Sequence, residues 1–286
     1  MNFLEENQFI IVKDHSVSKE TFSLLHNKEY DLLKTTPTPS LDVLSKYYES
    51  EDYISHTDGK RTLFEKIYHI VKRNAIKGKV SLITAEQNQN GKLLDIGSGT
   101  GDFLVEAKNQ GWDILGYEPN ADAKNLAVNK GVTFTEDIFA LPENSFDVVT
   151  MWHVLEHVPN LQEYITNLKR IVKPTGTIII AVPNYKSYDA KYYNRFWAAY
   201  DVPRHLWHFS KTSIKRLFSD VDMELKKVKP MWFDSFYVSL LSEKYKNGKM
   251  SFVKGFLIGF ISNVSGLFKK EFSSHIYIIK NNQNVK

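Results

Sequence analysis

Short apolar runs alternate with helical patterns along the middle of the chain. The runs predict five strands, at residues 93–96, 113–117, 132–135, 146–151 and 177–182. Segments 121–129 and 161–172 instead repeat their apolar residues at helical spacing. Strands that alternate with helices predict right-handed βαβ units and a parallel sheet. Segments 224–229 and 275–280 predict two further strands near the end of the chain.

The first 90 residues carry a different pattern. Apolar runs at 9–12 and 22–25 predict a small β-hairpin, and the turn-rich segment 35–40 precedes a helix expected to begin near Leu41. A longer helix is expected over 62–76, followed by a polar loop at 86–91. We therefore expect an N-terminal hairpin and helical cap over 1–90, and a second domain over 91–286.

Segment 250–268 predicts an amphipathic helix with one broad face of large apolar residues and an opposite face of small polar residues and glycines. Only 14 residues separate Lys254 from Lys269, fewer than the roughly 20 that cross a bilayer, so no transmembrane segment is expected. Packing inside the protein is the favoured interpretation of the apolar face. A partner or dimer surface and a peripheral membrane or lipid-substrate contact remain alternatives, the last supported by flanking lysines at 246, 249, 269 and 270.

Composition removes several classes of protein. The chain has no cysteine, which excludes a disulfide scaffold, a thiolate metal site and a cysteine nucleophile. Its 37 basic and 33 acidic residues are dispersed and give a net charge of +4, so no nucleic-acid partner is expected. The N-terminus is acidic and lacks the features of a secretory signal, so we expect a cytoplasmic protein, monomeric or homodimeric.

A glycine-rich loop follows the first strand of the parallel sheet. Glycine stands at 97, 99 and 101, and Asp102 departs from the dinucleotide-binding pattern G-x-G-x-x-G. Asp95 precedes the loop, where a negative charge favours a cationic or amine-bearing ligand over a pyrophosphate. Two more acids end the following strands: Glu118, placed to accept hydrogen bonds from ribose hydroxyls, and Asp137, placed near an adenine amino group.

This set of motifs resembles the class I S-adenosylmethionine (SAM)-dependent methyltransferases of the small-molecule type. The matching stretches are 94–101, Glu118, 137–138, 146–149, 153–158 and 172–176. The resemblance implies an α/β fold: a Rossmann-like, seven-stranded, mostly parallel sheet with helices on both faces, an N-terminal helical cap and a C-terminal helical insertion at 235–270. It also implies SAM as cofactor and S-adenosylhomocysteine as product. The cofactor-binding residues that it implies are Asp95, Gly97, Ser98, Gly99, Gly101, Glu118, Pro119, Asp137, Ile138 and His153.

The segment His153-Val-Leu-Glu-His157 literally matches the inverted zinc-protease signature H-x-x-E-H. That signature needs a long helix, whereas this segment directly follows a strand and Pro159 ends any helix within about a turn. We therefore expect no metal. His153 is the preferred cofactor or substrate neighbour and His157 a candidate general base, with structural polar roles as the alternative.

A second histidine cluster lies in segment 184–212, which occupies the place of the substrate lid in related methyltransferases. His205 is a further catalytic candidate, and Arg204 and His208 are candidate substrate contacts. The alternative is a hydrogen-bonded loop that anchors the lid. Tyr53 and His56 are further candidates for cofactor or substrate contact.

The leading hypothesis is an enzyme that transfers a methyl group from SAM to a small-molecule or lipid- or sugar-linked acceptor. A catalytically silent SAM-binding protein is the second hypothesis. A nicotinamide oxidoreductase is the third, disfavoured by Asp102.

Overall fold

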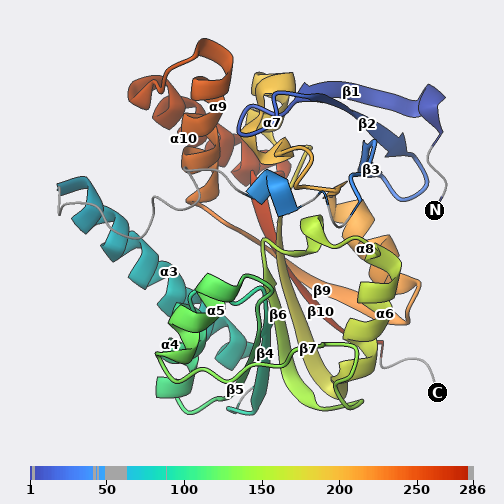
Figure 1. Ribbon diagram of the computed structural model, residues 1–286, viewed down its shortest axis with the longest axis vertical. Helices are drawn as coiled ribbons and strands as arrows, with labels where there is room; N and C mark the ends of the chain where they lie inside the picture. Colours follow the sequence, from blue (N-terminus) through green and yellow to red (C-terminus); the bar gives the residue numbers. More distant parts are fainter. Residues whose placement is uncertain (2–3, 41–42, 44, 49–62, 88, 283–286) are drawn as a thin grey trace.

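The protein contains two sheets, helices that cover the larger sheet, and an outlying pair of helices (Figure 1). The computed structural model describes residues 1, 4–40, 43, 45–48, 63–87 and 89–282. The larger sheet has six strands in the spatial order β5 (Asp113–Tyr117), β4 (Lys92–Ile96), β6 (Phe146–Trp152), β7 (Val172–Pro183), β10 (Ser274–Asn281) and β9 (Met223–Pro230). Strands β5, β4, β6 and β7 run parallel, and β10 is antiparallel to both of its neighbours.

The expected seven strands become six in the described part of the chain. Segment 132–135 forms only an isolated parallel bridge between Phe134 and Gly116. The two backbone hydrogen bonds of this bridge both involve Gly116, which donates to Thr133 and accepts from Thr135. Pairing therefore stops after one residue of β5 and no edge strand develops.

Alternating side chains of the central strands place one apolar core on each face of the sheet. On one face Leu93, Val148, Ile179 and Ile278 pack against α3 (Leu63–Gln87), α4 (Asp102–Asn109) and α5 (Ala121–Val128). On the other face Leu94, Val149, Ile178 and Ile279 pack against α6 (Leu161–Ile171) and α8 (Lys211–Ser219). The prediction of helices on both faces is confirmed.

Helix α3 is longer than the sequence pattern predicted, and it absorbs part of the expected polar loop. Val80 and Ile83 on its second half are fully buried against the sheet, which explains why the helix continues beyond residue 76. Glu86, in the last turn, is held by an ion pair of 2.8 Å to Lys227 on β9.

The N-terminal segment forms a second, antiparallel sheet. Its strands are β1 (Gln8–Lys13), β2 (Thr21–Asn27), β3 (Leu32–Thr36) and β8 (Trp207–His208), and short 3-10 turns lie at η1 (Glu5–Asn7) and η2 (Ser45–Tyr48). The predicted hairpin is thus extended by a third strand and by two residues of the lid segment. The helix expected near Leu41 lies outside the described residues, and the domain boundary at residue 90 stays a prediction.

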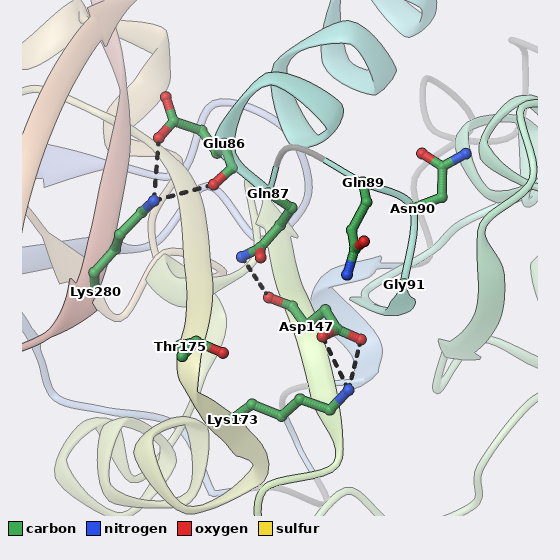
Figure 2. A pocket seen from close by; sticks show the side chains of 9 residues that line it. All are labelled: Glu86, Gln87, Gln89, Asn90, Gly91, Asp147, Lys173, Thr175 and Lys280. Carbon is green, nitrogen blue, oxygen red and sulfur yellow. Dashed lines mark hydrogen bonds and ion pairs between the residues drawn. The ribbon is translucent and has the colours of Figure 1, made fainter.

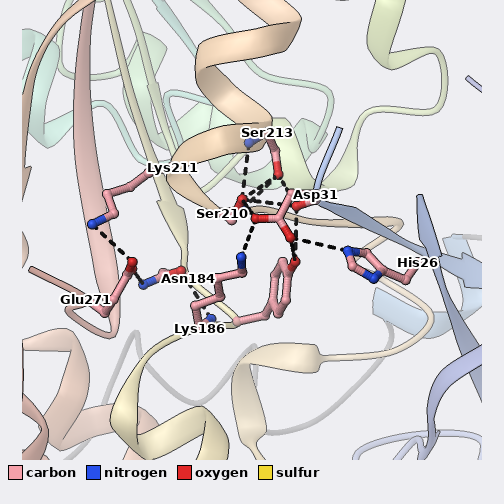
Figure 3. Close-up of polar contacts among 9 residues, drawn as sticks. His26, Asp31, Asn184, Lys186, Ser210, Lys211, Ser213 and Glu271 are labelled. Atoms are coloured by element: carbon pink, nitrogen blue, oxygen red, sulfur yellow. Dashed lines mark hydrogen bonds and ion pairs between the residues drawn. The ribbon is translucent and has the colours of Figure 1, made fainter. Parts of the chain in front are cut away.

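Asp31, in the turn between β2 and β3, fastens this sheet to the base of the lid (Figure 3). Its carboxylate accepts hydrogen bonds from the hydroxyls of Tyr185 and Ser210, both at 2.7 Å, and pairs with Lys186. Burial alone would raise the pKa of Asp31, but these hydrogen bonds outweigh it and lower the pKa.

The lid segment continues as α7 (Tyr188–Tyr193), η4 (Asn194–Phe196) and η5 (Ala198–Tyr200), and it packs against α9 (Asp234–Asn247) and α10 (Phe252–Lys269). A third core forms there, and it contains several aromatic side chains, of which Tyr193 and Trp197 are fully buried. Asp189 lies within this core and accepts hydrogen bonds from Trp197, Ser262 and Ser273 at 2.6 to 2.7 Å.

Helix α10 packs against the rest of the protein with its face of small residues and glycines, and not with the apolar face that was expected to pack inside. Its glycines lie against α9: a Cβ added at Gly259 would lie 2.9 Å from the Cα of Phe236, and one added at Gly255 would lie 2.9 Å from Leu240. The large apolar side chains point outward instead, so the expectation that they pack internally is wrong. By length and composition alone, α10 is also the one helix among the described residues that could cross a membrane.

We expect Asp31→Ala to lower the free energy of unfolding by about 2–3 kcal/mol, because Lys186 and several buried donors lose their acceptor. Urea unfolding at neutral pH measures the change. Asp220→Ala, which removes the exposed hydrogen bond of Tyr30, is the matched control and should cost less than about 1 kcal/mol. Equal losses in the two variants would contradict the anchoring role of Asp31.

Candidate active site

The glycine-rich loop joins β4 to α4 in a tight, left-handed path. Gly99 and Gly101 have φ of 53° and 77°, a region that residues with a Cβ rarely adopt. A Cβ at Gly101 would also lie 2.7 Å from that of Ala127, whereas at Gly99 nothing lies within 4 Å. The loop therefore packs tightly against α5 and leaves open space above Gly99. Its first two amides, at Gly97 and Ser98, donate to the carbonyl of Tyr117.

Glu118 lies across this loop. Its carboxylate accepts one hydrogen bond of 2.7 Å from the amide of Gly99 and another of 2.9 Å from Asn120. Pro119 is exposed beside it. The loop and the end of β5 thus hold a half-buried acid at the carboxyl edge of the sheet, where doubly wound folds bind their ligands.

Asp95 is almost fully buried behind the loop. It accepts a hydrogen bond of 2.5 Å from the Thr150 hydroxyl, and the ammonium of Lys79 on α3 attracts it. Burial outweighs both contacts and raises the pKa of Asp95 to about 7. A cationic group placed beside Asp95 would favour its ionised form.

His153 follows β6 in a left-handed conformation with φ of 58°, which turns its ring between two acids. Its Nδ1 lies 3.3 Å from Glu156 and its Nε2 lies 3.0 Å from Asp234, the first residue of α9. Burial alone would lower the pKa of His153, but the two carboxylates outweigh it and raise the pKa to about 10. The ring is therefore a cation at neutral pH, although its side chain remains 35% exposed.

His157 and His205 meet where the 3-10 turn η3 (Leu155–His157) contacts the lid. Their rings pack edge to face with centroids 4.6 Å apart. His157 donates from Nδ1 to the carbonyl of Arg204 at 3.0 Å, and His205 donates from Nδ1 to that of Ala199 at 2.9 Å. Burial, together with the neighbouring His157, lowers the pKa of His205 well below its usual value, so this ring is neutral.

Two candidate substrate contacts are engaged inside the lid. The guanidinium of Arg204 pairs with Asp201 and is only 13% exposed. His208 is buried in β8 against the Thr35 hydroxyl at 3.0 Å, and burial lowers its pKa to about 3. These contacts favour the alternative in which the lid histidine and arginine anchor the loop. Tyr53 and His56 lie outside the described residues.

The predicted adenine contacts occupy the turn after segment 132–135. Asp137 is exposed and accepts a hydrogen bond of 2.8 Å from the amide of Phe139. Ile138 is buried in the main core. The structure thus places the carboxylate at the same edge as Glu118 and gives the neighbouring isoleucine a packing role.

Comparison with known proteins settles the family. A family model described as "Methyltransferase domain" matches residues 63–228, more than half of the chain. The chain belongs to this family. It is a SAM-dependent methyltransferase of the class I small-molecule type.

Its relatives include proteins named ubiquinone biosynthesis O-methyltransferase. The one from Rickettsia typhi is 28% identical over 206 residues, which cover 63% of this chain and 80% of the relative. The one from Rickettsia canadensis is 28% identical over 205 residues, covering 66% and 87%. Among solved structures, magnesium protoporphyrin IX methyltransferase from Synechocystis PCC 6803 aligns with a TM-score of 0.56 over 85% of this chain and all of that chain. Its sequence identity is 14%, so it supports the fold alone.

The loop of this methyltransferase fits SAM. The space above Gly99 admits a ligand against the backbone, Glu118 offers a carboxylate beside it, and buried Asp95 suits an ammonium group. Asp102, which departs from the dinucleotide pattern, is neutralised by ion pairs to Lys72 at 2.6 Å and Lys130 at 2.5 Å. It therefore stabilises α4 rather than facing the ligand.

Glu156, His157 and His205 could hold a metal ion, because one ligand atom from each lies within 4.8 Å of the others. Oxygen Oε2 of Glu156 is buried without a hydrogen-bond partner among the described residues. The sequence analysis expected no metal, and that expectation stays a prediction.

Two residues of the site escaped the sequence analysis. Lys79 stands in a helix that reads as an ordinary amphipathic segment, and its ammonium lies over the Trp152 ring at 4.3 Å. Asp234 directly follows two aromatic residues in the sequence and lies about 80 residues after His153. Neither position belongs to a motif, and only the tertiary fold brings them to the sheet edge.

A polar pocket of about 530 Å³ lies away from this site (Figure 2). It opens at the other end of the strands, where Asp147 pairs with Lys173 at 2.8 Å and Lys280 contacts Glu86 at 3.6 Å. Its charged groups are thus paired with one another.

We expect Glu118→Ala to raise the SAM dissociation constant by about 10- to 100-fold, because a charged acceptor for the ribose hydroxyls is lost. Isothermal titration calorimetry measures the change. Glu136→Ala, at an acid whose side chain is 85% exposed, is the control and should bind within about twofold of wild type. An unchanged constant for Glu118→Ala would remove this residue from the ribose site.

We expect Asp95→Asn to stabilise the ligand-free protein in alkaline but not in acidic solution. Because its pKa is raised from 3.8 to about 7, the folded state holds a proton that the unfolded state releases, so the wild type loses stability as the pH rises from 4 to 7. The gain at pH 8 should be about 1–4 kcal/mol by urea unfolding and should disappear near pH 4. Asp113→Asn, at an exposed position, is the control. A gain in stability from Asp95→Asn that is independent of pH would contradict the assignment.

Proposed function

We propose that the enzyme methylates a hydroxyl oxygen of an acceptor that is a small molecule or is linked to a lipid or a sugar. The observation that carries this proposal is the position of His157. It ends a turn that contacts the lid at Arg204 and His205 and that follows Val154, whose side chain lies against Gly97 of the glycine-rich loop. The backbone amide of Leu206 in the lid donates to the carbonyl of Glu156 at 2.8 Å, so the lid closes directly over this turn. The O-methyltransferase names of the relatives support oxygen as the accepting atom.

Bound SAM supplies a methyl group on a positively charged sulfur; the sulfur–carbon bond breaks as the oxygen–carbon bond forms. His157 accepts the hydroxyl proton, so the acceptor attacks as an alkoxide or phenolate. Because Nδ1 of His157 donates its hydrogen to the Arg204 carbonyl, Nε2 is the nitrogen that takes the proton in this proposal. The buried lid excludes water, which protects the reacting groups and fixes their approach.

The other two catalytic candidates take supporting roles in this proposal. His153 is a poor base, because the carboxylates of Asp234 and Glu156 hold it as a cation and raise its pKa to about 10. It positions those acids and the turn that carries His157. His205 is neutral and buried, and its ring orients that of His157 through their edge-to-face contact.

The acceptor can be found by incubating the protein with methyl-labelled SAM and two extracts, one lipid-soluble and one water-soluble. We expect a labelled methyl ether, identified by mass spectrometry. SAM binding without any labelled product would favour the silent SAM-binding alternative. Binding of NAD in place of SAM would favour the oxidoreductase.

With that acceptor, we expect His157→Asn to lower kcat by about 100-fold or more, because general base catalysis is lost. The SAM dissociation constant should stay within about twofold of wild type, since no cofactor contact is removed. His26→Asn, on β2, is the control and should leave kcat unchanged. Unchanged turnover in His157→Asn, or an unchanged pH–rate profile, would dismiss this residue as the base.

A further inference from the structure

Helix α10 presents a continuous row of large apolar side chains to the outside. Eight of its side chains are between 37% and 84% exposed, and we call them the α10 apolar face: Phe252, Val253, Phe256, Leu257, Phe260, Val264, Leu267 and Phe268. Exposed aromatic residues also stand at 232, 233 and 237, around the start of α9. Figure 1 shows the two helices as a pair outside the six-stranded sheet. Contiguous apolar surface of this kind marks a binding surface.

The opposite side of the helix explains why the apolar face cannot turn inward. Gly255 and Gly259 lie so close to α9 that an added Cβ would overlap its backbone. Ser262 is buried and donates to Asp189 in the third core at 2.6 Å. Rotating α10 would therefore break this packing, so the outward orientation belongs to the fold.

Charge around the α10 apolar face indicates what covers it. Exposed lysines stand at both of its ends, at 246 and 249 before the helix and at 269 and 270 at its close. The acids of segment 232–271 are each neutralised: Asp234 pairs with His153, Glu243 with Lys254 and Glu271 with Lys211. The surface is thus apolar in the middle and basic at its ends, which complements an anionic layer over hydrocarbon.

We propose that the α10 apolar face docks onto the surface of an anionic lipid bilayer, with the helix lying along the interface. The large side chains enter the boundary between headgroups and acyl chains, and the end lysines meet lipid phosphates. A second copy of the chain fits less well, because like charges at both ends of the face would be brought together. The helix pair that carries the α10 apolar face also reaches the candidate active site, since Asp234 begins α9 and its carboxylate contacts His153 at 3.0 Å.

Co-sedimentation with vesicles tests the proposal independently of methyl transfer. We expect the wild type to bind vesicles of phosphatidylglycerol mixed with phosphatidylcholine about tenfold more tightly than vesicles of phosphatidylcholine alone. Val253→Asp combined with Phe268→Asp should weaken binding to both by about tenfold or more; the two side chains are 84% and 83% exposed, so the fold is not disturbed. Leu126→Asp combined with Val128→Asp, on exposed positions of α5, is the matched control and should bind as wild type does.

The lysines are tested by Lys249→Ala combined with Lys269→Ala and Lys270→Ala, which should remove the preference for the anionic vesicles. Absence of wild-type binding to either vesicle would overturn the proposal. So would a wild-type dimer that the Val253→Asp and Phe268→Asp pair turns into monomers, because the face would then be a subunit interface. Failure of methyl transfer in the extract assay would leave these readouts unaffected.

Discussion

The need to neutralise buried charge at the carboxyl edge of the sheet determines how its surroundings are arranged. Lys79, Asp234, His153 and Glu156 alternate in sign, although they come from three separate parts of the chain. Asp95 on β4 lies next to this series, where Lys79 attracts it while burial raises its pKa to about 7. An isolated ion in such a place would cost several kcal/mol, so the partners have to be present together. Helix α3, strands β4 and β6, and helix α9 are thereby fixed to one another at the carboxyl edge of the sheet.

This arrangement also gives His153 and His157 different roles, which the sequence alone does not distinguish. His153 and His157 belong to one motif, four residues apart, yet one is held as a cation between carboxylates and the other donates to a backbone carbonyl. The left-handed backbone at His153 produces the difference, because it turns that ring toward α9 while the following 3-10 turn carries His157 to the lid. A motif match alone does not specify this geometry.

Sequence reasoning identified the parallel sheet, the helices on both faces and the tight glycine-rich loop between β4 and α4, because these depend on local periodicity and on glycines at fixed offsets. It was wrong about the orientation of α10, since the pattern marks two faces but does not say which one meets a neighbour. Gly255 and Gly259 allow α9 to approach closely, and that close approach outweighs the burial of larger residues. Lys79 and Asp234 were missed because their roles depend on partners far away in the chain.

The pairing of β3 with β8 has a consequence for motion. Leu33 and Lys34 share a ladder with His208 and Trp207, and the turn at Asp31 is bonded to the residues on either side of the lid. The lid is therefore not a free loop that can swing on two hinges. To uncover the site, the antiparallel sheet must travel with it as one body or the ladder must break. Opening would then be a collective motion of the lid and the antiparallel sheet together, which belongs to the time scale of domain motions rather than of single loops.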